Sequence, residues 1–156
     1  MSVIASMLQS REDGEVNMKK IVIKGRSVFK GVGEGEALVS KQAISFLGGV
    51  DTETGLVIEK GHELEGKKVA GKVLIFPQGK GSTAGSYIIY ALARKGVAPK
   101  AMINLLAEPI IVTGAIIGRI PLMDKLEQNP LEVIQDGDWV RVDGERGVVE
   151  VTKASS

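Results

Sequence analysis

The stretch from Lys72 to Tyr90 constrains the fold most, because its pattern changes from that of a strand to that of a helix across a few glycines. Val73 to Phe76 is a short apolar run followed by a proline, which is typical of a strand buried on both faces. From Tyr87 to Leu92 apolar residues follow at helical spacing, and Gly96 is a natural stop. The stretch therefore predicts a buried strand, a glycine-rich turn and a helix.

The turn has the composition of an anion-binding site. Ser82 or Thr83 is predicted to cap the helix, whose first amides and dipole favour negative charge. Lys80 adds a mobile cation, while Gly79 and Gly81 allow a ligand to approach the backbone. The alternative is a well-capped connection that binds nothing. The spacing fits neither a Walker loop nor a full dinucleotide-binding fingerprint.

The segments after this helix predict more of a parallel sheet. Lys100 to Asn104 is a second apolar strand, and a right-handed crossover places it parallel to the first, with the turn at the carboxyl edge. Ile110 to Gly118 is predicted to be a third strand, alone or followed by a short helix, and Ile120 to Asp124 another short strand. Trp139 to Val151 predicts a hairpin around Asp143 and Gly144. Together these predict an α/β fold of the β/β/α kind, with a parallel βαβ unit and a β-hairpin tail.

The segment from Lys19 to Ser40 predicts two further β segments. Gly33 and Gly35 mark either a bulge or a close approach of another backbone. Glu34 and Glu36 fall on one strand face, where they form either a solvated surface or an acid/base pair.

The composition excludes several classes of function. The chain has no cysteine, so it supplies no disulfide, no thiolate nucleophile and no thiolate ligand for zinc or an iron–sulfur cluster. His62 is the single histidine and is predicted to be a surface loop residue, with no metal site expected. The 20 basic and 19 acidic residues nearly cancel, and no basic run with aromatics suggests nucleic-acid binding. Trp139 is predicted to fill the core.

The chain is predicted to form one swivel-type domain over residues 18–153, preceded by a disordered extension over residues 1–17. The longest apolar stretch, Ile110 to Ile117, is too short to cross a membrane, so no membrane association is expected. The first residues lack the basic region of a secretory signal, which favours a cytoplasmic location.

Four blocks of the sequence resemble the small subunit of the aconitase X family. In chain order they are Gly33–Val39, Ile44–Gly49, Phe76–Tyr87 and Gly96–Ala101. The resemblance extends from about Met18 to Lys153, and several blocks in the same order make it specific. It implies an aconitase-like swivelling domain that closes over a large catalytic subunit in a heterodimer. It also implies that a 4Fe–4S cluster belongs to the large subunit, with no cofactor bound by this chain.

The reaction that the resemblance implies is a hydro-lyase step of the archaeal mevalonate pathway, in isoprenoid biosynthesis. (R)-5-phosphomevalonate loses water there and becomes trans-anhydromevalonate 5-phosphate. The serine of the family's glycine-rich turn is the proton acceptor, and it falls on Ser82. Lys80, Gly81, Thr83 and Ser86 would contact the small anionic substrate or hold Ser82 in place. The partner would supply the iron that binds and expels the hydroxyl group.

Two alternatives stay open at this point. One is the small subunit of a hydroxyproline dehydratase of the same family, and the other is a non-catalytic swivel module that binds an anion. Aconitase small domains carry an arginine just beyond the serine, whereas this chain continues with Thr83, Ala84 and Gly85, so carboxylate recognition of the aconitase kind is not expected. The final hairpin is similar to that of phosphohistidine swivel domains, but the turn has no histidine, so a phosphocarrier role is rejected.

Overall fold

The computed structural model describes residues 19–154. The strands are β1 (Lys20–Lys24), β2 (Arg26–Phe29), β3 (Val32–Val39), β4 (Val73–Ile75), β5 (Ala101–Ile103), β6 (Leu122–Asp124), β7 (Trp139–Asp143) and β8 (Val148–Thr152). The helices are α2 (Gly85–Lys95), α3 (Pro109–Gly118) and α4 (Pro130–Val133). The predicted extension over residues 1–17 lies outside the described residues, and the predicted domain boundaries stay a prediction.

The strands form one sheet in the order β1-β8-β7-β3-β4-β5-β6-β2. β3 joins its two parts, because Val32–Glu36 pairs antiparallel with β7 while Ala37–Val39 pairs parallel with β4. β4, β5 and β6 continue in parallel. β1 and β2 lie at opposite ends of the order although only Gly25 separates them in the chain, so the sheet curls round until its two ends meet.

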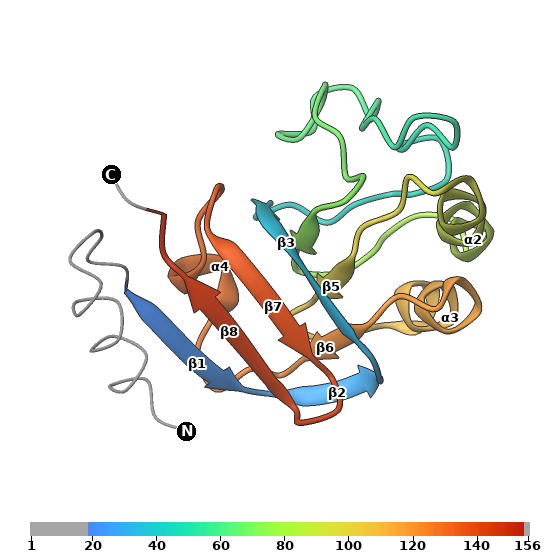
Figure 1. The fold of residues 1–156 in the computed structure, drawn as a ribbon. Coiled ribbons are helices and arrows are strands. Elements are labelled where there is room, and N and C mark those ends of the chain that lie inside the picture. Colours follow the sequence, from blue (N-terminus) through green and yellow to red (C-terminus); the bar gives the residue numbers. More distant parts are fainter. Residues whose placement is uncertain (1–18, 155–156) are drawn as a thin grey trace.

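Side chains along β4 alternate between two hydrophobic cores. Leu74 belongs to the core beneath α2 and α3, together with Met102 of β5. Val73 and Ile75 belong to the core shared with the antiparallel strands β1, β7 and β8. Figure 1 shows the two helices on one side of the parallel strands and the antiparallel layer on the other. The predicted β/β/α fold, with a β4–α2–β5 unit and a β7–β8 hairpin, is confirmed.

Residues 110–118 form helix α3, so the prediction of a strand there was wrong. The carboxylate of Glu108 accepts hydrogen bonds from the amides of Ile110 and Ile111, at 3.0 and 3.1 Å, and a proline occupies the first helical turn. Gly114 allows α2 to approach closely, because a Cβ atom there would lie 2.5 Å from Cδ1 of Ile89. Isoleucine and valine favour strands, but the cap and the packing against α2 decide this segment.

The N-terminal strands differ from the prediction in one respect. The first predicted segment is broken at Gly25 into β1 and β2, which pair with different partners. The close backbone approach at the two glycines of β3 is confirmed. A Cβ atom on Gly33 would lie 2.1 Å from the carbonyl oxygen of Lys100, and one on Gly35 would lie 2.6 Å from that of Gly71.

Candidate functional site

The glycine-rich turn follows β4 at the carboxyl edge of the parallel strands, as predicted. Two other segments of the chain pack against it, one on each side. On one side, Ile44 forms a β-bridge with Gly79, and the Lys80 amide donates to the Ile44 carbonyl oxygen at 3.0 Å. On the other side, a Cβ atom on Gly79 would lie 2.7 Å from Oε1 of Glu108, the cap of α3. These contacts leave no room for a side chain at Gly79, so glycine is required there.

The start of α2 corrects the predicted cap. The helix begins at Gly85, and its N-cap residue is Ala84, which offers no side-chain hydrogen bond. Ser82 and Thr83 lie directly before Ala84, and their carbonyl oxygens accept from the amides of Gly85 and Ser86 at 3.0 and 3.3 Å. The Ser82 Oγ atom accepts from the Ala84 amide at 3.1 Å. The serine hydroxyl thus bonds to the amide of the N-cap residue itself and not to an amide of the first helical turn, and the helix starts later than the pattern predicts.

The backbone of the turn presents hydrogen-bond donors to solvent. The amides of Gly81, Ser82 and Thr83 donate to no acceptor among residues 19–154. Gly81 has a φ of 84°, and all three residues are exposed. Consecutive unpaired amides attract an anion, and the dipole of α2 adds to this attraction.

The cation of the turn is held in an ion pair. The Nζ atom of Lys80 lies 2.9 Å from Oε2 of Glu59, and Oε1 of Glu59 accepts from the Ser45 amide at 3.2 Å. Burial raises the pKa of Glu59, but the hydrogen bonds from Lys80 and from the Ser45 amide outweigh it, so the pKa lies below the usual value. Lys80 therefore has a carboxylate partner that the sequence did not predict.

The sequence pattern did not reveal three residues that lie around the turn: Ser45, Glu59 and Glu108. Only the resemblance of the block Ile44–Gly49 to the family pointed to any of them, and it assigned no role. Their contacts with the turn join segments far apart in the chain, which local patterns cannot reveal.

Ser86 lies apart from the exposed residues of the turn. It is 5% exposed, and its Oγ atom donates to the Ile110 carbonyl oxygen at 2.7 Å, which ties α2 to α3. Beside it lies an open pocket of about 330 Å³ between the two helices, lined also by Thr83, Tyr87 and Ile117. Ser86 therefore supports the helix behind the turn, while Thr83 stands at the rim of the pocket.

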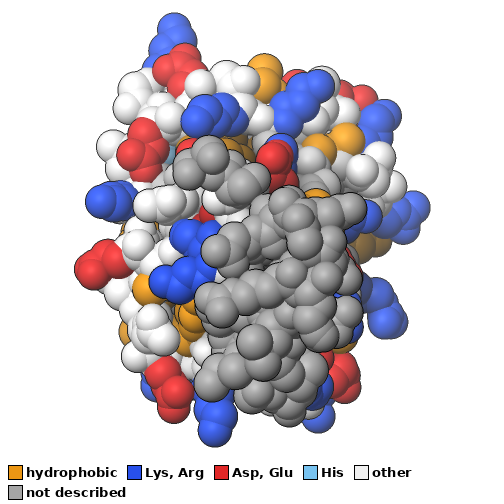
Figure 2. Space-filling model, turned by 60° about the vertical axis from the view of Figure 1, so that its left-hand side comes forward, with side chains coloured by type: hydrophobic (Ala, Val, Ile, Leu, Met, Phe, Trp, Pro, Cys, Tyr) orange, Lys and Arg blue, Asp and Glu red, His pale blue; other side chains and the backbone are white. Residues whose placement is uncertain are grey.

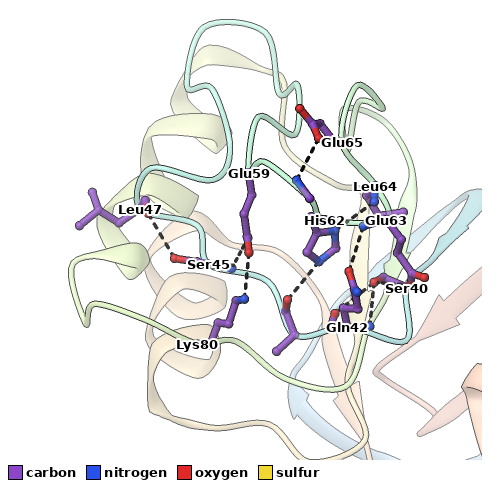
Figure 3. Close-up of polar contacts among 12 residues, drawn as sticks. Ser40, Gln42, Ser45, Leu47, Glu59, His62, Glu63, Leu64, Glu65 and Lys80 are labelled. Atoms are coloured by element: carbon purple, nitrogen blue, oxygen red, sulfur yellow. Dashed lines mark hydrogen bonds and ion pairs between the residues drawn. The ribbon is translucent and has the colours of Figure 1, made fainter.

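His62 is buried rather than at the surface, which corrects the prediction. It is 6% exposed, its Nδ1 atom accepts from the Leu64 amide at 3.0 Å, and Nε2 lies 3.0 Å from the Ala43 carbonyl oxygen. Nε2 therefore carries the proton and donates to Ala43. Figure 3 shows the ring pointing from its loop towards the segment that carries Gln42 and Ser45. The histidine is a structural link between two loops.

Glu34 and Glu36 form separate surface ion pairs. Glu34 accepts from Trp139 Nε1 at 2.8 Å and pairs with Arg141 at 2.9 Å, and these bonds, that of Trp139 above all, hold its pKa below the usual value. Glu36 pairs with Lys72, which precedes β4 and so lies at the opposite end of the strand from the turn. Both contacts favour the solvated surface over the acid/base pair. Trp139 is 49% exposed, so its predicted place in the core was wrong.

The described part of the chain offers neither a metal site nor a membrane-spanning helix. Residues 19–154 contain no group of three or more histidine, aspartate or glutamate side chains that could hold a metal ion. No helix in the same range is long and apolar enough to cross a membrane. Figure 2 shows basic and acidic side chains interspersed on the face that it draws, in keeping with the near balance of charge.

Sequence comparison finds the same family along most of the chain. The family described as Aconitase X swivel domain matches residues 22–151. The phosphomevalonate dehydratase small subunit of Methanocella arvoryzae is 64% identical over 130 residues, which are 83% of this chain and 98% of the relative. The phosphomevalonate dehydratase small subunit of Methanosarcina acetivorans is 54% identical over 136 residues, 87% of this chain and 94% of the relative.

Structural comparison agrees. The crystal structure of Thermococcus kodakaraensis aconitase X in its holo-form superposes with a TM-score of 0.79 at 48% sequence identity. The match covers 84% of this chain and 98% of that chain. The sequence comparison and the structural comparison therefore indicate the same family.

Proposed function

The chain belongs to the aconitase X swivel domain family, and from that premise we propose that it is the small subunit of a hydro-lyase. The substrate is (R)-5-phosphomevalonate, and the product is trans-anhydromevalonate 5-phosphate. The observation that carries this proposal is the high identity, over nearly their whole length, to relatives named phosphomevalonate dehydratase small subunit. The place of the reaction is the archaeal mevalonate pathway, in the cytoplasm.

The proposed partner is a large catalytic subunit that carries a 4Fe–4S cluster. The present chain has no cysteine, and residues 19–154 hold no cluster of metal ligands, so the ligand set must come from the partner. When bound, an iron of the cluster would act as the Lewis acid that accepts the hydroxyl group of the substrate. The small subunit would approach from the other side with the base.

We assign the base to Ser82. Dehydration needs a group that takes the proton from the carbon next to the one that loses hydroxide, and a serine does this only if its alkoxide is stabilised. The Ala84 amide already donates to Ser82 Oγ at 3.1 Å. This hydrogen bond would become stronger as the oxygen became negative. The hydroxyl group is exposed and donates to no acceptor among residues 19–154, so its oxygen can reach a substrate.

The other residues of the turn take two roles in this proposal. The unpaired amides of Gly81 and Thr83 and the ammonium group of Lys80 would bind the anionic groups of the substrate. Ser86 would hold α2 against α3 and so keep the turn in place, because its hydroxyl group already donates to Ile110.

The substrate assignment is tested with the purified small subunit and its cognate large subunit under anaerobic conditions. Dehydration of 5-phosphomevalonate is expected only when both chains are present, with hydroxyproline as the comparison substrate. Turnover of hydroxyproline alone would move the assignment to the related dehydratase. If a cluster-loaded pair turned over neither compound but the small subunit bound phosphate, the chain would be the non-catalytic anion-binding module.

A further inference from the structure

A loop remote in sequence from the glycine-rich turn reaches across to its lysine. Glu59 lies at the start of this loop, and its carboxylate pairs with Lys80 through one oxygen and accepts from the Ser45 amide through the other. Figure 3 shows the Glu59 side chain between the two. The side chain of Glu59 is 22% exposed, whereas that of Lys80 is 49% exposed. The glutamate is thus the fixed member of the pair and the lysine the accessible one.

The loop that carries Glu59 is itself anchored. Three residues further on, His62 is buried and donates to the Ala43 carbonyl oxygen at 3.0 Å. The next residue in the chain, Ile44, forms the bridge with Gly79 of the turn. The loop and the turn are therefore fastened to the same short segment, so that Glu59 has a fixed position relative to the site.

A lysine binds an anion more tightly if its side chain is held in place before binding. Its ammonium group sits on a flexible four-carbon stem, and ordering a side chain of this kind on ligand binding weakens the affinity. In this structure the ion pair with Glu59 places the ammonium group at one position beside the turn. An arriving phosphate or carboxylate would meet the cation at a defined place on the rim of the turn.

We propose that Glu59 is a positioning residue that acts through Lys80, orienting its ammonium group towards the anionic group of the substrate. The inference rests on the proposed function, because it takes Lys80 as a substrate contact. Glu59 does not itself touch the substrate. Its effect is therefore expected on substrate binding and not on proton transfer at Ser82.

The test is Glu59→Gln in the assembled two-chain enzyme. Glutamine keeps an acceptor for the Ser45 amide but loses the charge that holds Lys80. The KM for 5-phosphomevalonate is expected to rise about 2- to 10-fold, the range for losing one preordered side chain, while kcat changes less than about twofold. The matched control is Glu53→Gln, which removes the same 2.9 Å type of pair, with Lys95 at the far end of α2. The control is expected to leave both constants unchanged.

A double-mutant cycle shows whether the effect passes through the lysine. In a Lys80→Gln background, Glu59→Gln is expected to raise KM no further, because the group that it orients is gone. An unchanged or lowered KM in Glu59→Gln alone would overturn the proposal. So would an equal rise in KM in the presence and absence of Lys80.

A measurement without turnover separates this inference from the proposed function. In the isolated chain, the NMR order parameter of the Lys80 ε-methylene group is expected to fall in Glu59→Gln and to stay unchanged in Glu53→Gln. An unaltered order parameter would refute the positioning role even if the enzyme were fully active. If the order parameter fell in Glu59→Gln as expected but the wild-type two-chain enzyme were inactive, the dehydratase assignment would be refuted and the positioning role kept.

Discussion

At the scale of single residues, Gly81 shapes the site most directly. Its φ of 84° lies in the left-handed region, and a Cβ atom there would lie 2.6 Å from Oγ of Ser45. Glycine therefore meets two requirements at once, the conformation of the turn and the close passage of the neighbouring segment. The amide that follows belongs to Ser82, so the position of the proposed base depends on this residue.

Gly81→Ala is expected to lower both stability and activity. The left-handed conformation alone costs an alanine about 1–2 kcal/mol, and the clash with Ser45 must move the turn as well. Urea unfolding measures the first effect, and kcat of the two-chain enzyme the second. Gly66→Ala is the control, because Gly66 has a φ of 85° with open space around it. If both variants lost stability but kept kcat, Gly81 would have no role in placing the base.

Local sequence pattern indicated some residues of the candidate site and missed others. The glycines, Lys80 and Ser82 stand together in the sequence between a strand and a helix, so they could be found there. Glu59 and Ser45 could not, because they meet the turn only after the chain has folded. The partnership of Lys80 with Glu59 could not be foreseen for the same reason.

At the scale of elements, helix α3 shows where sequence pattern fails. Its segment is apolar on every side and rich in isoleucine, so periodicity cannot distinguish a buried strand from a helix. The sequence did contain the deciding signals, Glu108 and Pro109, at the positions of a helix cap and first turn. β4, β5 and the β7–β8 hairpin were predicted correctly because each is a short apolar or alternating run bounded by turn residues.

Glu108→Ala is expected to destabilise the chain by about 0.5–2 kcal/mol, the usual cost of losing a helix cap. The variant leaves the amides of Ile110 and Ile111 without their acceptor. The midpoint of urea denaturation measures the loss. Glu108→Gln keeps one acceptor oxygen and is expected to lose less. Equal stability of wild type and Glu108→Ala would mean that α3 is held by packing alone.

At the scale of the whole molecule, the C-terminal end of the described chain is fastened by a buried carboxylate. Asp138 is 2% exposed, and it accepts from Lys153 and from the amides of Ala154 and Gln135. Burial raises the pKa of Asp138, but the bonds from Lys153 and the two amides outweigh it, so the pKa lies below the usual value. These contacts join the start of β7 to the residues that follow β8.

Asp138 is expected to make stability depend on pH in acid. Since its folded-state pKa is lowered, its contribution is complete above the pKa of the unfolded chain and is lost as the pH falls through the folded-state value. Asp138→Asn should therefore be less stable than wild type at pH 7, and the difference should begin to shrink near the ordinary aspartate pKa of about 3.9 and go on shrinking until the pH is below the folded-state value. Urea midpoints at several pH values measure this. The exposed Glu145→Gln on the same hairpin is the control. A constant difference at all pH values would contradict the account.

The proton acceptor is the central claim, and Ser82→Ala tests it most directly. In the anaerobic assay with the large subunit, kcat is expected to fall by about two to four orders of magnitude, as for other acid/base residues, with assembly of the two chains unchanged. Ser27→Ala is the matched control, since its buried hydroxyl group on β2 has no partner in the described chain. A Ser82→Ala enzyme that turned over 5-phosphomevalonate at the wild-type rate would contradict the assignment of the base.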